Sequence, residues 1–133
     1  PVMLTSRIKP TAKALFVPTT YIGPFEGVSI EAGFSGTPVI TTPWGCFAEN
    51  ILDHVTGFRC ATLDDFVWAA KHVDKINPKD CRDWCTKNFT IERVGLMYDH
   101  YFTQLYGLLN KGWYEAVDRE DDGYRQWLRR YYP

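Results

Sequence analysis

Three short apolar runs set the architecture, because each suits a buried strand and helical segments separate them. The runs are Ala14–Pro18 (ALFVP), Pro38–Thr41 (PVIT) and Gly57–Cys60 (GFRC). Short apolar runs bounded by turn residues are typical of parallel strands that are buried on both faces. We therefore predict an α/β fold, with a Rossmann-like half sheet of about three to four parallel strands, helices on both faces, and C-terminal helices after the sheet.

The segment between the first two runs carries a pattern of period two, yet a helix suits its position better. The apolar residues from Val28 to Phe34 alternate with others, which taken alone indicates a strand. The segment is short, however, closes with Gly36 and leads directly into the second apolar run. We therefore predict a loop over Tyr21–Glu26, a helix over Gly27–Ser35, and Gly36 as the glycine that ends this helix.

Capping residues and apolar spacing predict four further helices. Thr62 stands before two aspartates and makes a good N-cap, and Pro78 suits the first turn of a helix. Thr90 is the expected N-cap of a long amphipathic helix. The predicted helices are Phe47–Leu52, Leu63–Val73, Pro78 to about Lys87, and Thr90–Leu109. Residues 1–109 then form the domain, and residues 110–133 form an aromatic and charged tail that we expect to pack on this domain or on another.

Length, composition and charge restrict the classes of function. The 133 residues allow one domain or two at most, and 45% hydrophobic and 16% aromatic residues are enough to bury a core. A net charge of −1 disfavours general nucleic-acid binding. No run approaches the roughly 18 apolar residues of a transmembrane helix, and the N-terminus lacks the order of a signal peptide. We expect a cytoplasmic protein, and a chain that begins within a longer reading frame because it lacks an initiator Met.

The cysteines favour neither a disulfide framework nor a metal site. Cys46, Cys60, Cys81 and Cys85 are too sparse for a disulfide framework. Cys81 and Cys85 share a helix face, but zinc needs two more ligands and the three histidines show no matching spacing. Reduced, partly buried thiols are the favoured interpretation, zinc is the alternative, and we expect no metal.

The junction from Val17 to Ala32 is the chemically richest segment. Parallel strands present their carboxyl ends, and the N-termini of the helices that follow, to a common edge where ligands bind. A helix that begins near Gly27 offers free N–H groups and a positive dipole end, which suit a phosphate. Glu31, about one turn inside, is placed to accept hydrogen bonds from two neighbouring hydroxyls, as on a ribose. The alternative is a solvated Glu31 and an ordinary turn glycine.

Residues 14–73 resemble the C-terminal domain of GT-B glycosyltransferases of the family-4 type (glycosyl transferases group 1). That family carries a pattern like E-P-F-G-x-V-x-x-E-A-x-x-x-G-T-P-V-I, then a loop with Gly and Glu, then V-T-G-(F/Y). The matching residues here are Pro24-Phe25, Val28, Glu31-Ala32, Gly36-Thr37-Pro38-Val39-Ile40, Gly45, Glu49 and Val55-Thr56-Gly57-Phe58. The helices up to about residue 109 also look like the end of that domain.

The resemblance implies a retaining glycosyltransferase of the hexosyl type. Such an enzyme transfers a sugar from a nucleotide-diphosphate sugar, its donor substrate, and needs no metal or other cofactor. Glu31 takes the place of the glutamate that binds the donor ribose. The implied donor-binding residues are Gly23, Pro24, Phe25, Gly27, Val28 and Glu31.

Two departures from the family pattern bear on activity. The family's leading Glu, eight positions before Glu31, is Gly23 here, and Glu26 is the candidate catalytic replacement for that carboxylate. The domain also lacks its first strands and the acceptor-binding half, so we expect no transfer by this chain alone. We further expect the open edge of Ala14–Pro18 to be covered by Val2–Leu4, by the tail, by the missing N-terminal domain or by another chain.

The preferred interpretation is thus the donor-binding fragment of a glycosyltransferase. A non-catalytic α/β interaction module or a degenerate glycosyltransferase is the alternative, which Gly23 favours. A nucleotide-sugar epimerase shares the architecture but fits the motif less well.

Overall fold

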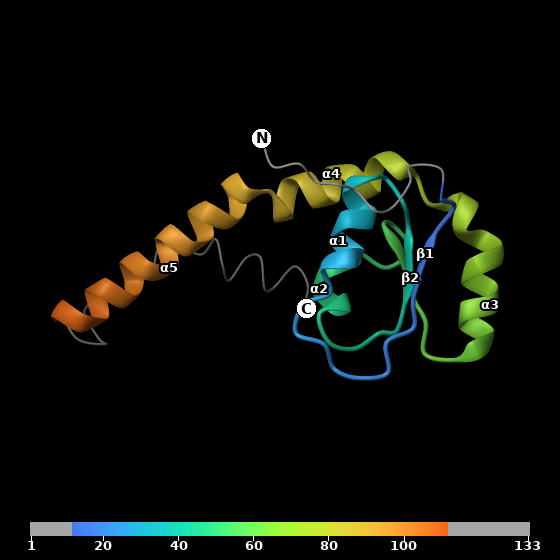
Figure 1. The fold of residues 1–133 in the computed structure, drawn as a ribbon, viewed down its shortest axis with the longest axis horizontal. Helices are drawn as coiled ribbons and strands as arrows, with labels where there is room; N and C mark the ends of the chain where they lie inside the picture. Colours follow the sequence, from blue (N-terminus) through green and yellow to red (C-terminus); the bar gives the residue numbers. More distant parts are fainter. Residues whose placement is uncertain (1–11, 112–133) are drawn as a thin grey trace. The chain divides into compact units, whose positions relative to one another are not determined.

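The structure, a computed structural model, describes residues 12–111. The chain divides into two compact units, Pro1–Asn88 and Phe89–Pro133. In chain order the elements are β1 (Leu15–Val17), α1 (Gly27–Phe34), β2 (Val39–Thr41), α2 (Phe47–Asn50), β3 (Gly57–Arg59), α3 (Leu63–His72), the 3-10 turn η1 (Val73–Lys75), α4 (Pro78–Phe89) and α5 (Ile91–Lys111) (Figure 1).

The three strands form one parallel sheet in the order β1-β2-β3. Leu15 pairs with Val39, and Val39 pairs with Gly57. Each connection between neighbouring strands contains a helix, as parallel pairing requires. The predicted fold class is therefore confirmed as a Rossmann-like half sheet with helices after its strands.

Helices cover both faces of the sheet, because successive strand residues point to opposite sides. One face presents Ile40 and Phe58 to Ala69 of α3, in a core that also contains Cys60, Val73, Ile76 and Cys81. The other face packs Val39 against Ala32 of α1 and Phe47 of α2. Figure 1 shows α1 and α2 on one side of the strands and α3 on the other.

The predicted helix over Gly27–Ser35 is present as α1, which buries Ser29, Ile30, Ala32 and Gly33. Gly36 ends it at a φ of +76°, in the left-handed region that suits glycine. The Thr37 N–H then donates to the carbonyl of Ala32 at 2.8 Å. The packing of this segment on the sheet therefore determines its secondary structure, and its alternating sequence pattern does not.

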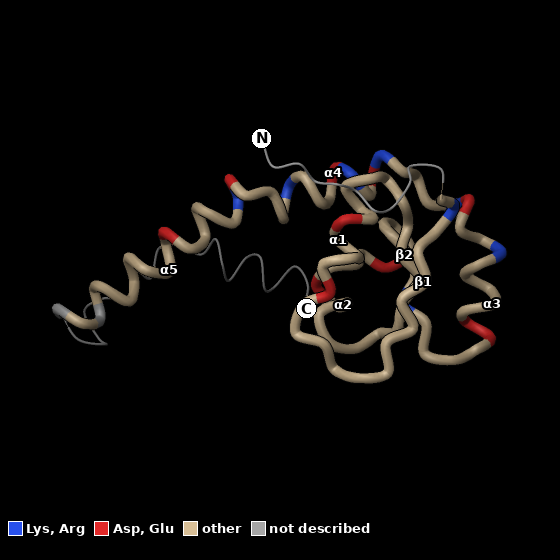
Figure 2. Tube along the Cα trace, in the orientation of Figure 1, with Lys and Arg blue, Asp and Glu red and all other residues tan. Residues whose placement is uncertain are grey.

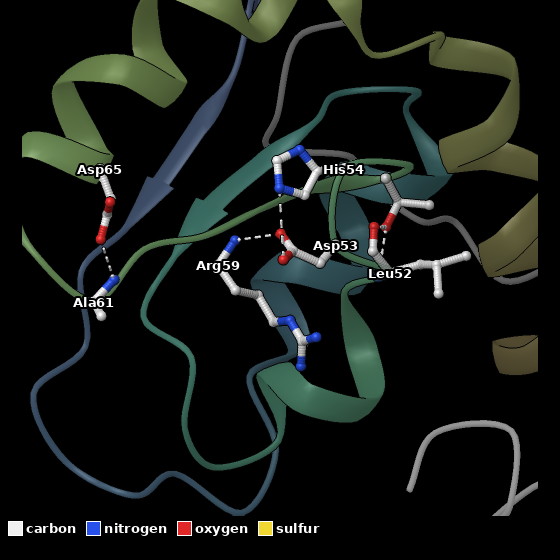
Figure 3. A network of polar contacts seen from close by, with 7 residues as sticks. Leu52, Asp53, His54, Arg59, Ala61 and Asp65 are labelled. Carbon is white, nitrogen blue, oxygen red and sulfur yellow. Dashed lines mark hydrogen bonds and ion pairs between the residues drawn. The ribbon is translucent and has the colours of Figure 1, made fainter. Parts of the chain in front are cut away.

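A polar network shapes the turn that leads into β3 (Figure 3). The Asp53 carboxylate accepts the backbone N–H of Arg59 at 2.9 Å, and the Thr56 hydroxyl accepts that of Leu52 at 2.9 Å. His54 takes a φ of +61° between these two anchors. The side-chain bonds thus hold the backbone of the turn in a conformation that a residue with a Cβ seldom adopts.

The predicted cap of α3 is confirmed. Thr62 Oγ1 accepts the Asp65 N–H at 3.2 Å, and Asp65 Oδ2 accepts the Thr62 N–H at 2.9 Å. The two bonds form a capping box, which satisfies two backbone donors at once.

Several helix boundaries differ from the prediction by one or two residues, and α1 and α3 each end one residue early, at Phe34 and His72. The helix predicted to reach Leu52 ends at Asn50, because Ile51 is already extended at φ −114° and ψ 115°. The helix predicted to end near Lys87 continues to Phe89. The last helix spans Ile91–Lys111 and follows Thr90, whose hydroxyl accepts the Arg93 N–H at 3.3 Å.

The second unit presents an apolar helix surface. Within α5 the large side chains Ile91, Leu96, Tyr98, Tyr101, Phe102, Leu105, Tyr106 and Leu109 are exposed. None of the helices within residues 12–111 has both the length and the apolar character that crossing a membrane requires.

The cover predicted for the first strand stays a prediction. Among the described residues β1 pairs with β2 alone, and its Phe16 is 50% exposed. The predicted covers Val2–Leu4 and the tail from residue 112 lie outside the described residues.

Candidate functional site

The loops after β1 and β2 meet at the carboxyl edge of the sheet. Two side chains from the second loop donate to the same backbone carbonyl in the first. The Thr42 hydroxyl reaches the Thr19 oxygen at 2.8 Å, and Trp44 Nε1 reaches it at 3.1 Å. The path of the first loop is therefore fixed from the neighbouring strand.

A close backbone approach between two glycines joins the loops again. Gly45 has a φ of +64°, and a Cβ on it would lie 2.8 Å from the Gly23 oxygen and 3.1 Å from the Gly23 nitrogen. The Cys46 N–H donates to the same Gly23 oxygen at 3.1 Å. Only a residue without a Cβ fits at position 45, and the start of α2 holds Gly23 in place.

The N-terminus of α1 opens at this edge without a side-chain cap. Glu26 occupies the N-cap position, and its carbonyl accepts from Ser29 through the N–H at 3.0 Å and the hydroxyl at 2.6 Å. Its carboxylate makes no capping bond, and the first turn of α1 holds no acidic residue. Within the described part of the chain, the positive N-terminal end of α1 thus has no side-chain cap, whereas that of α3 is occupied by its own capping box.

The carboxylate of Glu26 turns toward Gly23. Its Oε1 accepts the Tyr21 hydroxyl at 2.9 Å and lies 2.6 Å from where a Cβ on Gly23 would stand. The hydrogen bond to Glu26, and then the charge of that carboxylate, raise the pKa of Tyr21 above its ordinary value. The carboxylate therefore occupies the space in which a side chain at position 23 would begin.

The sequence-predicted site residues lie together in this loop and the first turns of α1. Gly23 is buried, Pro24 and Phe25 are exposed, and Glu31 is half-buried. Val28 is 38% exposed. Gly27 and Glu31 are four residues apart on α1 and therefore share a face.

Arg59 is not among the site residues predicted from the sequence. It is the last residue of β3 and stands in register with Thr41, so it lies on the face of the sheet that α1 and α2 cover. Its Nε is buried and has no hydrogen-bond partner among the residues that the structure describes. Successive residues of a strand point to opposite faces of the sheet, so alternation along Gly57–Arg59 would have placed Arg59 on the face opposite to Phe58.

Arg59 is notable because the loops beside it carry no basic residue. Between Lys13 and Arg59 the formally charged residues are all acidic: Glu26, Glu31, Glu49 and Asp53. Figure 2 shows no Lys or Arg on the loops after β1 and β2. Among the residues that the structure describes, the N–H groups of α1 and the Arg59 side chain are the positive groups at this edge.

The thiols are unsuited to nucleophilic chemistry. All four cysteines are free and buried. Burial raises the pKa of Cys60 and of Cys81 to about 11, and that of Cys85 to about 12. No group of three or more His, Cys, Asp or Glu within residues 12–111 is placed to hold a metal ion.

Comparison with known proteins adds no assignment. No model of a known protein family matches the chain, and the search of curated proteins finds no match. The geometry of the carboxyl edge and the residues that form it are thus the basis for a functional proposal.

Proposed function

We propose that this chain is the donor-binding part of a retaining glycosyltransferase, and that it holds a nucleotide-diphosphate sugar at the carboxyl edge of its sheet. The observation that carries the proposal is the uncapped N-terminus of α1, at the point where the loops after β1 and β2 are held together. A helix N-terminus in this position binds phosphate through its free N–H groups and its dipole.

The diphosphate lies against the N–H groups of Gly27 and Val28. A Cβ on Gly27 would meet only the Phe25 ring, at 3.8 Å, so the fold itself does not require glycine there. Close approach by a phosphate does favour glycine at such a position. Glu31, one turn further on the same face as Gly27, accepts hydrogen bonds from the ribose hydroxyls.

Arg59 contributes a positive charge to the same edge. The charge of its guanidinium and its place at the end of β3 suit an anion held between the carboxyl ends of the strands. Together with the dipole of α1, it replaces a metal ion in stabilising the diphosphate as the leaving group.

Glu26 is the proposed catalytic residue on the donor side. Its carboxylate is available to the hydroxyl groups of the donor sugar, beside the diphosphate. Sugar transfer also requires a surface that binds the acceptor, which we propose is supplied by a further domain. This chain alone therefore binds the donor and transfers no sugar.

Calorimetric titration with UDP and GDP tests the proposal. At least one nucleotide is expected to bind, and Glu31→Ala is expected to weaken the affinity about tenfold, because two hydrogen bonds to a carboxylate are lost. Asp80→Ala, on the exposed first turn of α4, is the matched control and leaves the affinity unchanged. Equal affinities for the wild type and Glu31→Ala contradict the assignment of Glu31.

A non-catalytic interaction module is the second candidate, and the exposed apolar surface of α5 favours it. Ile91 is 71% exposed, Leu96 66% and Leu109 84%. Apolar surface of this kind marks an interaction site. Failure of every nucleotide and nucleotide sugar to bind supports this candidate over the first.

A further inference from the structure

We propose that Tyr21 is a positioning residue that holds the Glu26 carboxylate over Gly23, where that carboxylate receives hydroxyl groups of the donor sugar. The inference rests on the proposed function and adds to it the residue that orients the Glu26 carboxylate. It also assigns a role to Gly23, which supplies the space that the carboxylate occupies.

The carboxylate of Glu26 occupies the space in which a side chain at position 23 would begin. Glu26 Oε1 stands 2.6 Å from the Cβ position of Gly23, which is closer than a real Cβ approaches such an atom. Gly23 itself is fixed by its contacts with Gly45 and Cys46. Any side chain at position 23 therefore displaces the carboxylate of Glu26.

Tyr21 decides which way that carboxylate turns. A glutamate at the N-cap of a helix lies beside free N–H groups and is attracted to them. In that orientation it would occupy the place of the donor phosphate. The hydroxyl of Tyr21 instead binds Oε1 at 2.9 Å, and its ring lies 3.3 Å from the Cβ position of Gly23. The N–H groups of α1 thus stay available for the diphosphate of the donor, and the Glu26 carboxylate stays available for its sugar.

The loop sequence supports a shared position. The pattern that residues 23–26 resemble reads E-P-F-G, whereas this chain reads G-P-F-E. The same two residues stand in exchanged places. The exchange leaves the loop with a single carboxylate in either order.

The test compares affinities for UDP and UDP-glucose, and for GDP and GDP-mannose, by calorimetry with the full chain. The ratio within each pair isolates the contribution of the sugar. Glu26→Gln is expected to lower that ratio about tenfold and Tyr21→Phe about threefold, since one removes a charged acceptor and the other only its anchor. Tyr98→Phe, on exposed α5, is the matched control and leaves the ratio unchanged.

A double variant that exchanges the residues at positions 23 and 26 tests whether a carboxylate at either position supports sugar binding. Gly23→Glu combined with Glu26→Gly is expected to restore the ratio to within about twofold of the wild-type value. Gly23→Glu alone is expected to reduce the ratio, because the new side chain displaces the Glu26 carboxylate. An unchanged ratio in Glu26→Gln and Tyr21→Phe, with the nucleotides still bound, overturns the inference and leaves the proposed function standing.

A second readout does not depend on the nucleotide. In carbon-labelled tyrosine NMR, Glu26→Gln is expected to lower the pKa of Tyr21 toward its ordinary value. If no nucleotide binds, the proposed function fails and the sugar-contact part of the inference fails with it. The titration then decides the positioning part: an unshifted Tyr21 in Glu26→Gln overturns it, and a lowered pKa supports it.

Discussion

Gly45→Ala is expected to destabilise the first unit by about 3 kcal/mol, because Gly45 joins the two loops of the site. A Cβ in the left-handed region costs about 1 to 2 kcal/mol. That Cβ also stands 2.8 Å and 3.1 Å from two backbone atoms of Gly23, which no side-chain rotation relieves. Overpacking of this kind costs about 1 to 3 kcal/mol more.

The assay is urea unfolding, followed by pulsed labelling of the buried thiols Cys60 and Cys81, which lie in the core of the first unit. At a slope of about 1.5 kcal/mol per molar urea, the midpoint falls by about 2 M. Gly27→Ala is the matched control, since its Cβ makes one ordinary contact at 3.8 Å, and its midpoint should stay near that of the wild type. A Gly45→Ala midpoint within about 0.3 M of the wild-type value contradicts the close contact between positions 45 and 23.

Three further predictions concern the capping box and the thiols. Thr62→Ala should lower the free energy of unfolding by about 1 kcal/mol in the same assay, whereas Thr86→Ala, at an exposed position of α4, should not lower it. Hydrogen bonds from Thr62 lower the pKa of Asp65 below its ordinary value. The ionised Asp65 therefore stabilises the fold above about pH 4, and this stabilisation is lost as the pH falls through the lowered pKa. Asp65→Asn should remove this part of the decrease in stability at acid pH. Ellman's reagent at about pH 8 should label none of the four thiols in the folded chain and all four in urea, because burial raises the pKa of each; rapid labelling of the folded chain would contradict the burial.

The strands and most caps were predictable because their signals are local. Each strand is a short apolar run, and Thr62 stands three residues before Asp65, the spacing of a capping box. Gly36 ends α1 as expected because a left-handed residue is needed there. The end of α2 was predicted two residues late, because the extended backbone at Ile51 depends on the turn into β3.

The candidate site was predictable only in outline. Its loop and the Gly27 helix start follow from the sequence, but the contact of Gly23 with Gly45 joins residues 22 positions apart and depends on strand pairing. The Tyr21 to Glu26 bond requires the actual path of the loop. Arg59 was missed because its importance arises from the lack of other basic residues at the sheet edge.

Amide chemical shifts of the nitrogen-labelled chain, titrated with UDP and with GDP, test the central claim most directly. We predict that the largest changes fall on the N–H groups of Gly27 and Val28, at the uncapped start of α1. Those of Leu63 and Asp64, at the start of α3 with its capping box, should stay in place. Changes that spare Gly27 and Val28, or no change with either nucleotide, would contradict a donor site at this edge.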